Sequence, residues 1–347
     1  MRHCYLLVLL IFLFHGIPVH GDGVDYRSPW RSGDSLTLLH SGNDQYLDDL
    51  PMAVSLDGYI SFAWENDLYY QQDYYFTNGF QIDFFHDRLR QSPINRILIP
   101  IRDPKEGIIW SGLQLRQEIF TPKDLAMDTI SAGDHPYSST LTLAQVSVFN
   151  LPASRLRIVS GLKLGVLGPA SLGFKTQELA HLVSNPSRPP QGWDYQVRND
   201  LIVNYDLQVE KGLIQHGIAL FGLKGKGRLG TLHTDLETGL WFRLDARKGY
   251  FNRFGPSGGP GLNVIFLLSA SATYVFYDAT LQGGVINKSS PYILAPDHLI
   301  RWLGNLEGSI TFEFYRHQLE VYTQMTSPRF RLAQPHGWMG MAYKLWF

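Results

Sequence analysis

Two carboxylates and an amide stand side by side at Glu65, Asn66 and Asp67, and Thr77 follows ten residues later, with apolar runs on either side. Carboxylate, amide and backbone oxygens are the ligands that a hard cation such as calcium takes, although no EF-hand spacing accompanies them. Glu65 and Asp67 are therefore candidate metal ligands, because a bound cation would neutralise both carboxylates. The simpler alternative is a polar turn at the end of a strand.

A histidine in a segment with helical character is the second candidate for chemistry. Residues 172–185 (LGFKTQELAHLVSN) predict a short helix in which Gln177 and His181 lie one turn apart. The ordinary pKa of histidine suits general-base catalysis near neutral pH. A lone histidine in a loop is more often solvated or structural, so the helix alone does not make His181 catalytic.

The elements that must position these residues are β-strands. In residues 60–67 the apolar side chains Ile60, Phe62 and Trp64 share one face, and Glu65 belongs to the other, more polar face. The same alternation with period two recurs along the chain and indicates strands with one apolar and one polar face. Twelve such runs are expected, at 58–68, 74–87, 111–120, 138–149, 155–166, 194–210, 213–223, 232–246, 263–278, 302–315, 318–328 and 337–347.

The length and number of these runs indicate a membrane barrel. Many have ten or more residues, which suits the roughly 9–11 tilted residues that cross a bilayer, and the chain ends on alternating apolar residues up to Phe347. We therefore predict an all-β fold, a 12-stranded antiparallel transmembrane β-barrel of the bacterial outer membrane, with a short helix in an extracellular loop. A soluble β-sandwich or lipocalin-like barrel is the alternative, because the sequence does not show which face is inside.

The N-terminal residues predict targeting and a segment before the barrel. Residues 1–21 combine Arg2 with an apolar run and small residues at the end, as in a secretory signal peptide. We expect a signal peptide at 1–21, an N-terminal periplasmic extension at 22–57 and the barrel at 58–347. The only cysteine, Cys4, lies in the signal peptide, so disulfides and thiol catalysis are excluded for the mature chain. No later segment has the apolar length that a transmembrane helix requires.

Composition and short motifs argue against two further classes. The 347 residues carry a formal net charge of −1, and they contain neither a Lys/Arg run nor a zinc-ligand spacing. No nucleic-acid partner is therefore expected. The sequence also lacks a G-x-S-x-G motif, which argues against a serine hydrolase.

Chain topology gathers the candidate residues at one end of the barrel. If the N-terminus starts in the periplasm, the connection after each odd-numbered strand faces outward. Periplasmic connections are then expected to include the short turns 150–154, 210–213 and 315–317, and the longer segments 88–110 and 247–262. The expected outer connections hold nearly all the unusual polar sequence and run over 68–75, 121–137, 167–193, 224–231, 279–301 and 329–336.

Asn66 does not fit this alternation. Its neighbours Glu65 and Asp67 would face the barrel interior, and strict alternation would therefore aim Asn66 at lipid. We expect the first strand to bulge or end at this residue.

Seven motifs, in this order along the chain, resemble the outer-membrane lipid A 3′-O-deacylase family. The resemblance covers residues 58–347 and is strongest over 60–200. The motifs are END at 65–67, YFTNG at 75–79, QEIFTPKD at 117–124, DHPY at 134–137, GVLGPAS at 165–171, QELAH at 177–181 and GWDYQ at 192–196.

The resemblance implies a barrel that uses calcium (Ca²⁺) to hydrolyse the 3′-linked acyloxyacyl ester of lipid A. It implies that Asn66 and Asp67 are the family's active-site pair, Thr77 its hydroxyl residue and His181 its catalytic histidine. Gln177, one helical turn earlier, is expected to bind substrate. In this chemistry His181 deprotonates a water that attacks the ester carbonyl, while Ca²⁺ polarises the carbonyl and stabilises the oxyanion.

The chain departs from the family in two places. Some members carry a Lys-Arg pair in the second outer loop, where this chain has Met127 and Asp128, and we expect Lys123 to contact the substrate instead. The family's Asp-Arg-Pro-Tyr is DHPY here, so His135 replaces a cation that could meet a phosphate. Both changes affect substrate binding and leave the implied catalytic set intact.

The sequence therefore favours a monomeric esterase that acts on lipid A or lipopolysaccharide and is surrounded by outer-membrane lipids. We expect the lipid to approach sideways from the membrane and to be seated by Trp64, Phe76 and Trp193. Two alternatives stay open. One is an esterase or phospholipase for another membrane lipid, and the other is a non-catalytic, porin-like barrel whose rim carboxylates select cations.

Overall fold

The computed structural model describes residues 57–70, 73–99, 107–184, 190–256 and 261–347. The side chains of Leu68 and of residues 180–184 also lie outside this description. The predicted signal peptide and, apart from Asp57, the predicted N-terminal extension fall on residues that are not described, so both stay predictions.

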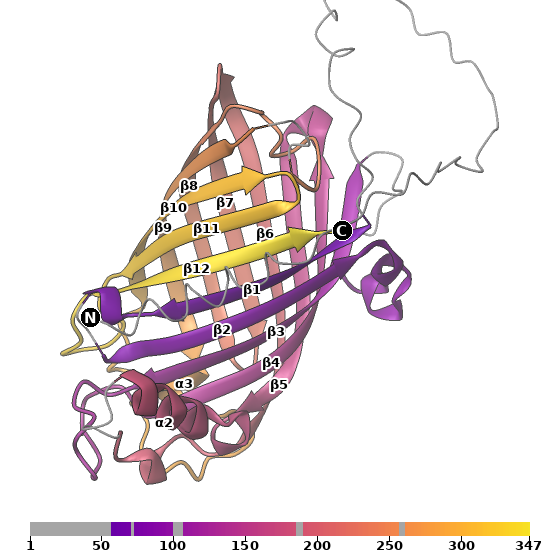
Figure 1. The fold of residues 1–347 in the computed structure, drawn as a ribbon. Helices are drawn as coiled ribbons and strands as arrows, with labels where there is room; N and C mark the ends of the chain where they lie inside the picture. The colour runs from indigo at the N-terminus through magenta and orange to yellow at the C-terminus, as the bar shows by residue number, and fades with distance from the viewer. Residues whose placement is uncertain (1–56, 71–72, 100–106, 185–189, 257–260) are drawn as a thin grey trace, which may run out of the picture. The chain divides into compact units, whose positions relative to one another are not determined.

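Twelve antiparallel strands close into a barrel in which each strand pairs with its sequence neighbours and β1 pairs with β12 (Figure 1). The predicted fold class is confirmed. The strands are β1 Gly58–Asn66, β2 Tyr75–His86, β3 Ile108–Thr121, β4 Ser138–Leu151, β5 Leu156–Leu167, β6 Asp200–His216, β7 Ala219–Gly230, β8 His233–Asp245, β9 Asn263–Asp278, β10 Trp302–Phe314, β11 His317–Thr326 and β12 His336–Trp346.

The period-two pattern assigns the two faces of the wall correctly. On β1, Ile60, Phe62 and Trp64 are 46%, 51% and 41% exposed, whereas Ser61 and Glu65 are buried. Apolar side chains therefore face outward and polar ones face the lumen, as expected for a barrel whose solvent is lipid. Among the described residues, no helix is long and apolar enough to cross a bilayer.

Short helices lie in the connections. The predicted rim helix is α2, Gly173–Ser184. A four-residue helix α3, Ala279–Gln282, lies between β9 and β10, and short 3-10 turns occur in the connection that holds α2 and in others. The 3-10 turns are η1 Leu68–Tyr70, η2 Asp87–Gln91, η3 Pro93–Arg96, η5 Pro152–Ser154, η6 Pro169–Ser171 and η7 Trp193–Tyr195.

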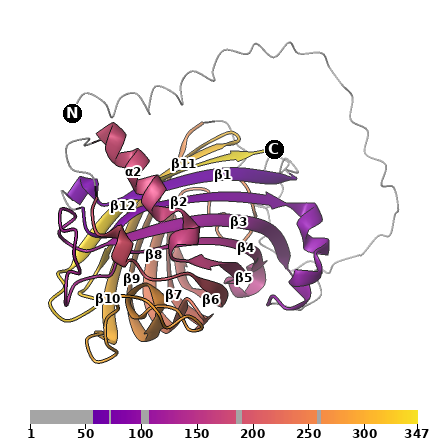
Figure 2. The same ribbon diagram turned by 90° about the horizontal axis from the view of Figure 1, so that it is seen from below.

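The two ends of the barrel differ in their connections. Backbone hydrogen bonds join Gly58 and Phe347, so the start of β1 and the end of β12 lie at the same end of the barrel. The short β4–β5 and β10–β11 turns lie at this end, as predicted, and we assign it to the periplasm. The connections β1–β2, β3–β4 and β5–β6 are at the opposite, outer end, where Figures 1 and 2 show α2.

One predicted turn is wrong. β6 runs through residues 210–213 and continues to His216, with a register shift between Gly212 and Ile214. The chain reverses instead at Gly217, whose φ of 55° is favourable for glycine and allows a tight turn before Ile218. β7 is displaced accordingly, so most of the predicted outer connection 224–231 is strand.

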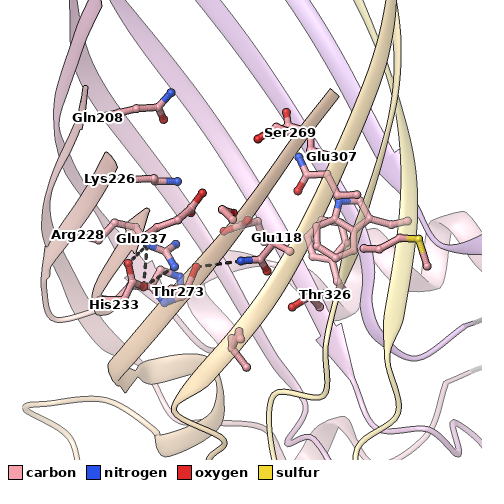
Figure 3. Close-up of a pocket in the computed structure, with 18 of the residues that line it drawn as sticks. Glu118, Gln208, Lys226, Arg228, His233, Glu237, Ser269, Thr273, Glu307 and Thr326 are labelled. Atoms are coloured by element: carbon pink, nitrogen blue, oxygen red, sulfur yellow. Dashed lines mark hydrogen bonds and ion pairs between the residues drawn. The ribbon is translucent and has the colours of Figure 1, made fainter. Parts of the chain in front are cut away.

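Charged side chains fill the lumen. They line a cavity of about 520 Å³, and Figure 3 shows Lys226 and Arg228 facing Glu307 across it. Lys224 bridges Glu237 at 3.0 Å and Glu307 at 3.7 Å. Opposite charges therefore neutralise one another inside the barrel.

Aromatic side chains close the periplasmic end of the lumen. Trp241 packs with Tyr250 and Phe251 from the β8–β9 connection. A neighbouring cluster combines Tyr59, Phe85, Val148 and Trp346 with partly buried aromatic residues. Trp241 and Tyr250 also line the cavity, whereas Arg243 and Asp245 further along β8 do not, so the cavity ends at this aromatic layer.

Candidate active site

The first strand ends at Asn66, as predicted, but the bulge lies on the partner strand. The register of β2 against β3 shifts between Phe76 and Asn78, which leaves Thr77 as the extra residue. Asn66 Nδ2 donates a hydrogen bond to the Thr77 carbonyl at 2.7 Å. Thr77 and Thr121, both buried, share a hydroxyl hydrogen bond of 2.7 Å. The bulge therefore fixes Asn66 and Thr77 against each other.

The bulge also turns Phe76 away from the position predicted for it. Phe76 is buried, lines the lumen and packs against Phe120 and Trp338. Strict alternation from Phe80 would have placed it on the lipid face, and the extra residue at Thr77 reverses that assignment. The expectation that Phe76 seats a lipid from the membrane side is therefore wrong.

Asp67 is completely buried directly after β1. Its Oδ2 accepts a hydrogen bond from the Tyr74 backbone N–H at 2.9 Å, and its Oδ1 has no partner among the described residues. Burial raises the pKa of Asp67 to about 9. The Tyr74 N–H opposes this rise, and the negative charge of Asp73 adds to it. The carboxylate thus lacks a positive partner in the part of the chain that is described.

Glu65 lies on the other side of the wall and is already neutralised. Its Oε2 accepts from Arg116 Nη2 at 2.6 Å, and its Oε1 accepts from the Tyr322 hydroxyl at 2.7 Å. Glu65 lines the lumen cavity, whereas Asn66, Asp67 and Thr77 do not. This arrangement favours a structural role for Glu65 over the predicted one as a metal ligand.

The helix α2 is attached to the outside of the wall at the outer end. Gln117 pairs with Phe80 in register and shares its outward face, and its Nε2 donates to the Ser171 carbonyl at 2.5 Å. The Ser139 and Ser171 hydroxyls share a hydrogen bond, also of 2.5 Å. α2 begins two residues after Ser171, so β3 and β4 fix its N-terminal end.

The side chain of Gln177 is buried where α2 packs on Trp193. Its Oε1 accepts from Trp193 Nε1 at 2.8 Å, while its Nε2 has no described partner. Trp193 is buried against Tyr137, so it holds the helix and does not present an open surface to lipid, contrary to prediction. His181 lies one turn further along α2, but its side chain is outside the described residues.

Lys123 lies beside the Asp67 loop. Its backbone N–H donates to Asp134 Oδ2 at 2.8 Å, and its ammonium is 5.9 Å from the centroid of the Tyr74 ring. Tyr74 in turn donates its backbone N–H to Asp67. Lys123 is therefore a cation at the same rim, adjacent to the residue that holds the buried carboxylate.

His135 does not replace the missing cation. It is buried, stacks on Phe120 at 5.4 Å, and donates from Nδ1 to the Pro136 carbonyl at 2.7 Å. Burial, reinforced by the charge of Arg329, lowers the pKa of His135 to about 3. It is therefore neutral near pH 7.

The residues around Asp67 fit a hard cation. Two oxygens, Asp67 Oδ1 and Asn78 Oδ1, are buried without a described partner, and Asn78 is the register partner of Asn66. Among the described residues no group of three or more His, Cys, Asp or Glu could hold a metal ion. A cation here would therefore need amide, hydroxyl or backbone oxygens beside Asp67, which calcium accepts.

Two features of the site were not predicted from the sequence. The unpartnered Asn78 oxygen belongs to the YFTNG motif, so the motif pointed to the right segment without singling out the residue. Gln117, which ties Ser171 to the wall, likewise begins the QEIFTPKD motif.

The family model described as "Outer membrane protein LpxR" matches residues 45–346. The chain belongs to the LpxR family. The solved structure of LpxR from Salmonella typhimurium superposes with a TM-score of 0.67 at 16% identity, covering 83% of this chain and 100% of that one. A search of curated protein sequences finds no match.

Two further solved structures are less similar. The beta domain of the Bordetella autotransporter Brka has a TM-score of 0.43 at 9% identity, over 84% of this chain and 100% of that one. An outer membrane channel from Pseudomonas putida has a TM-score of 0.43 at 11% identity, over 86% and 98%. Nothing about this LpxR-family chain follows from either. Family and barrel together make the chain an integral outer-membrane protein.

Proposed function

We propose that this LpxR-family chain is a calcium-dependent lipid A 3′-O-deacylase that acts in the outer leaflet of the outer membrane. The observation that carries the proposal is the buried carboxylate of Asp67, which has no cationic partner among the described residues and lies at the same rim as α2. A structural carboxylate would be expected to have a cationic partner, as Glu65 has in Arg116. Asp67, which does not line the lumen cavity, is instead available to hold a cation at the outer rim.

The chain's own residues supply binding and proton transfer. Asp67, with the amide oxygen of Asn78, would hold Ca²⁺. Ca²⁺, when bound, polarises an ester carbonyl and stabilises the oxyanion. Asn66 and Thr77 are held in fixed positions by the bulge, which limits the reorganisation that the site needs.

His181 provides the base. Its imidazole takes a proton from a water molecule whose oxygen forms a bond to the ester carbonyl carbon. The bond from that carbon to the sugar 3′-oxygen breaks, and the 3′-oxygen receives the proton. The products are a free acyloxyacyl carboxylate and a sugar 3′-hydroxyl. Gln177 would fix the turn of α2 that precedes His181.

Two observations support a lipid substrate. Asn66 lies two residues after Trp64, on the same face of β1 as the exposed Phe62 and Trp64, so this side of the proposed site faces the bilayer and not the lumen. Lys123 is a cation beside the Tyr74–Asp67 contact, where it could meet an anionic headgroup. The ion pairs in the lumen, and the aromatic layer of Trp241, Tyr250 and Phe251 at its periplasmic end, give no support to the porin-like alternative.

A substrate panel tests the proposal. Purified full-length protein is reconstituted with lipid A, or with phosphatidylethanolamine and phosphatidylglycerol, with calcium and then with a calcium chelator. We expect loss of the 3′-acyloxyacyl group from lipid A only, and no reaction after chelation. Hydrolysis of phospholipid with intact lipid A would favour the lipase alternative, and unchanged activity after chelation would remove calcium from the mechanism.

A further inference from the structure

The connection from β2 to β3 folds onto the outside of the barrel wall at the periplasmic end. Residues 87–99, here called the strap, contain η2 and η3 and follow β2 directly. In Figures 1 and 2 they form the purple coil beside the wall, at the end opposite α2. The proposed enzyme activity gives this strap no role.

The strap covers a row of serines on the lipid-facing side of the wall. Ser111, Ser147 and Ser160 are register partners across β3, β4 and β5, and all three are buried. Asn95 Nδ2 donates to Ser111 Oγ at 3.1 Å, and Ser160 Oγ donates to the Ile99 carbonyl at 2.6 Å. Two of the three hydroxyls that would otherwise face lipid, those of Ser111 and Ser160, are thus satisfied by the strap.

The next outward-facing row is also bonded to the strap. Gln145 Oε1 accepts from Ser92 Oγ at 2.7 Å, and its Nε2 donates to Asn95 Oδ1 at 3.0 Å. On β6, the Tyr205 hydroxyl donates to the Ile97 carbonyl at 3.1 Å and accepts from the Ile99 N–H at 3.2 Å. The strap therefore crosses four strands, from β3 to β6.

The strap ends where the lipid-exposed wall begins. Leu143 and Leu164, one outward-facing row beyond Gln145, are 51% and 50% exposed. Their exposure marks apolar wall that contacts acyl chains. The strap consequently lies between this wall and the periplasm, at the level of the headgroups of the periplasmic leaflet.

The outer surface of the strap is basic and apolar. Leu98 is buried, but its neighbours Ile97 and Ile99 are 56% and 39% exposed. The arginines at 88, 90 and 96 are exposed, and the strap's one acidic residue, Asp87, pairs with the arginine at 90 at 3.1 Å. Neither of the other two guanidinium groups has an ion pair with a described residue. A strap that served only to cover the serines would need no cations on its far side.

We propose that the strap is a docking surface for anionic phospholipids of the periplasmic leaflet. The guanidinium groups of Arg88 and Arg96 bind phosphate groups, to which their planar fork is suited. Ile97 and Ile99 enter the adjacent acyl region, as in other interfacial segments that combine cations with apolar side chains. The bound lipids hold the periplasmic end of the barrel at a fixed depth in the membrane.

Lipid retention by the purified full-length protein tests this. The protein is given equal amounts of phosphatidylglycerol and phosphatidylcholine in detergent, and retained lipids are counted by native mass spectrometry. We expect wild type to retain more phosphatidylglycerol than phosphatidylcholine. In the double variant Arg88→Gln/Arg96→Gln this ratio of retained lipids should fall by about fivefold for each arginine removed. The matched control is Lys248→Gln, which removes an exposed cation at the same end from the β8–β9 connection.

Three results decide the proposal. An unchanged preference in the double variant would overturn it, provided that the variant keeps the heat-resistant gel mobility of a folded barrel. An equal loss in Lys248→Gln would also overturn it, because the effect would then be one of general charge. Ile97→Ser/Ile99→Ser should reduce retention of both lipids and keep the preference. Unchanged retention there would contradict the insertion of the two isoleucines.

Discussion

Asp67 is the residue at which burial and charge conflict most strongly. Its side chain is completely buried, one of its oxygens has no partner in the described part of the chain, and burial raises the pKa of its carboxyl to about 9. Around neutral pH the group must therefore either hold a proton or face a cation. Glu65, two residues earlier, is also buried, but its charge is balanced by the ion pair with Arg116. The two carboxylates therefore have different roles.

Calcium binding at Asp67 should therefore release a proton. Because the pKa of the free carboxyl is raised to about 9, protons compete with the cation below that pH, and the affinity for calcium should rise as pH rises toward 9. Calorimetric titration at pH 7 in two buffers of different ionisation enthalpy measures the release, which should approach one proton per ion. Binding without proton release would show that the ion is held elsewhere.

The variant Asp67→Asn tests how the buried carboxyl affects the stability of the fold and the binding of calcium. A carboxyl whose pKa is raised from 3.8 to about 9 stabilises the fold below pH 3.8 and loses that stabilisation as pH rises through 9. Calcium-free wild type should therefore become less stable to urea between these limits, while Asp67→Asn should not.

The same variant should lower calcium affinity by at least about tenfold. Asp128→Asn, at an exposed position in the next outer loop, is the matched control and should behave as wild type in both measurements. Parallel pH profiles of wild type and Asp67→Asn would contradict the assignment.

At the scale of elements, the strands were predictable because alternation reports directly on which face meets lipid. The faces of β1 follow from residues 60–65 alone. The β6–β7 turn was misplaced because 210–213, with a charged pair and a glycine, resembles a turn as much as Gly217 does. Local sequence does not distinguish a bulge from a reversal when both need a glycine.

The candidate site was predictable as a set of segments but not as a geometry. The ion pair of Glu65 depends on Arg116, and its second bond comes from Tyr322, which is 257 residues away in sequence. The bulge at Thr77 appears only once β2 is paired with β3. The order of the motifs identified the rim. Strand register then separated Glu65, which lines the lumen cavity, from Asn66, which is on the opposite face of β1.

The attachment of α2 can be weakened without disturbing the barrel. Trp193→Phe keeps an aromatic ring against Tyr137 but removes the N–H that Gln177 accepts at 2.8 Å. Leaving that buried oxygen without a donor should destabilise the attachment of α2 by about 1–3 kcal/mol, without affecting the strands of the barrel. We expect faster amide exchange over 173–184 and reduced deacylation, with an unchanged unfolding midpoint of the barrel.

Trp64→Phe is the control for this change, because Trp64 is exposed on the lipid face of β1. It should leave the exchange of α2 as in wild type. Equal protection of α2 in Trp193→Phe and wild type would mean that the Trp193–Gln177 bond does not hold the helix.

At the scale of the whole molecule, the barrel is a closed scaffold. Ion pairs cross its lumen, and the lumen cavity ends at Trp241 and Tyr250, which pack with Phe251. We expect wild type to give no steady conductance in planar bilayers, and Tyr250→Ala/Phe251→Ala to admit small ions. Phe242→Ala, which removes an exposed ring from the outer face beside Trp241, should stay silent. Steady conductance of wild type would revive the porin-like alternative.

The wall thus separates two environments, with a neutralised lumen inside and a polar site outside that faces lipid. The most direct test of the central claim is mass spectrometry of lipid A from cells expressing wild type, His181→Ala or Asp67→Ala at equal levels of folded barrel. Our account predicts that wild type removes the 3′-acyloxyacyl group and that both variants leave it in place. Intact lipid A with folded wild type, or full deacylation by His181→Ala, would contradict it.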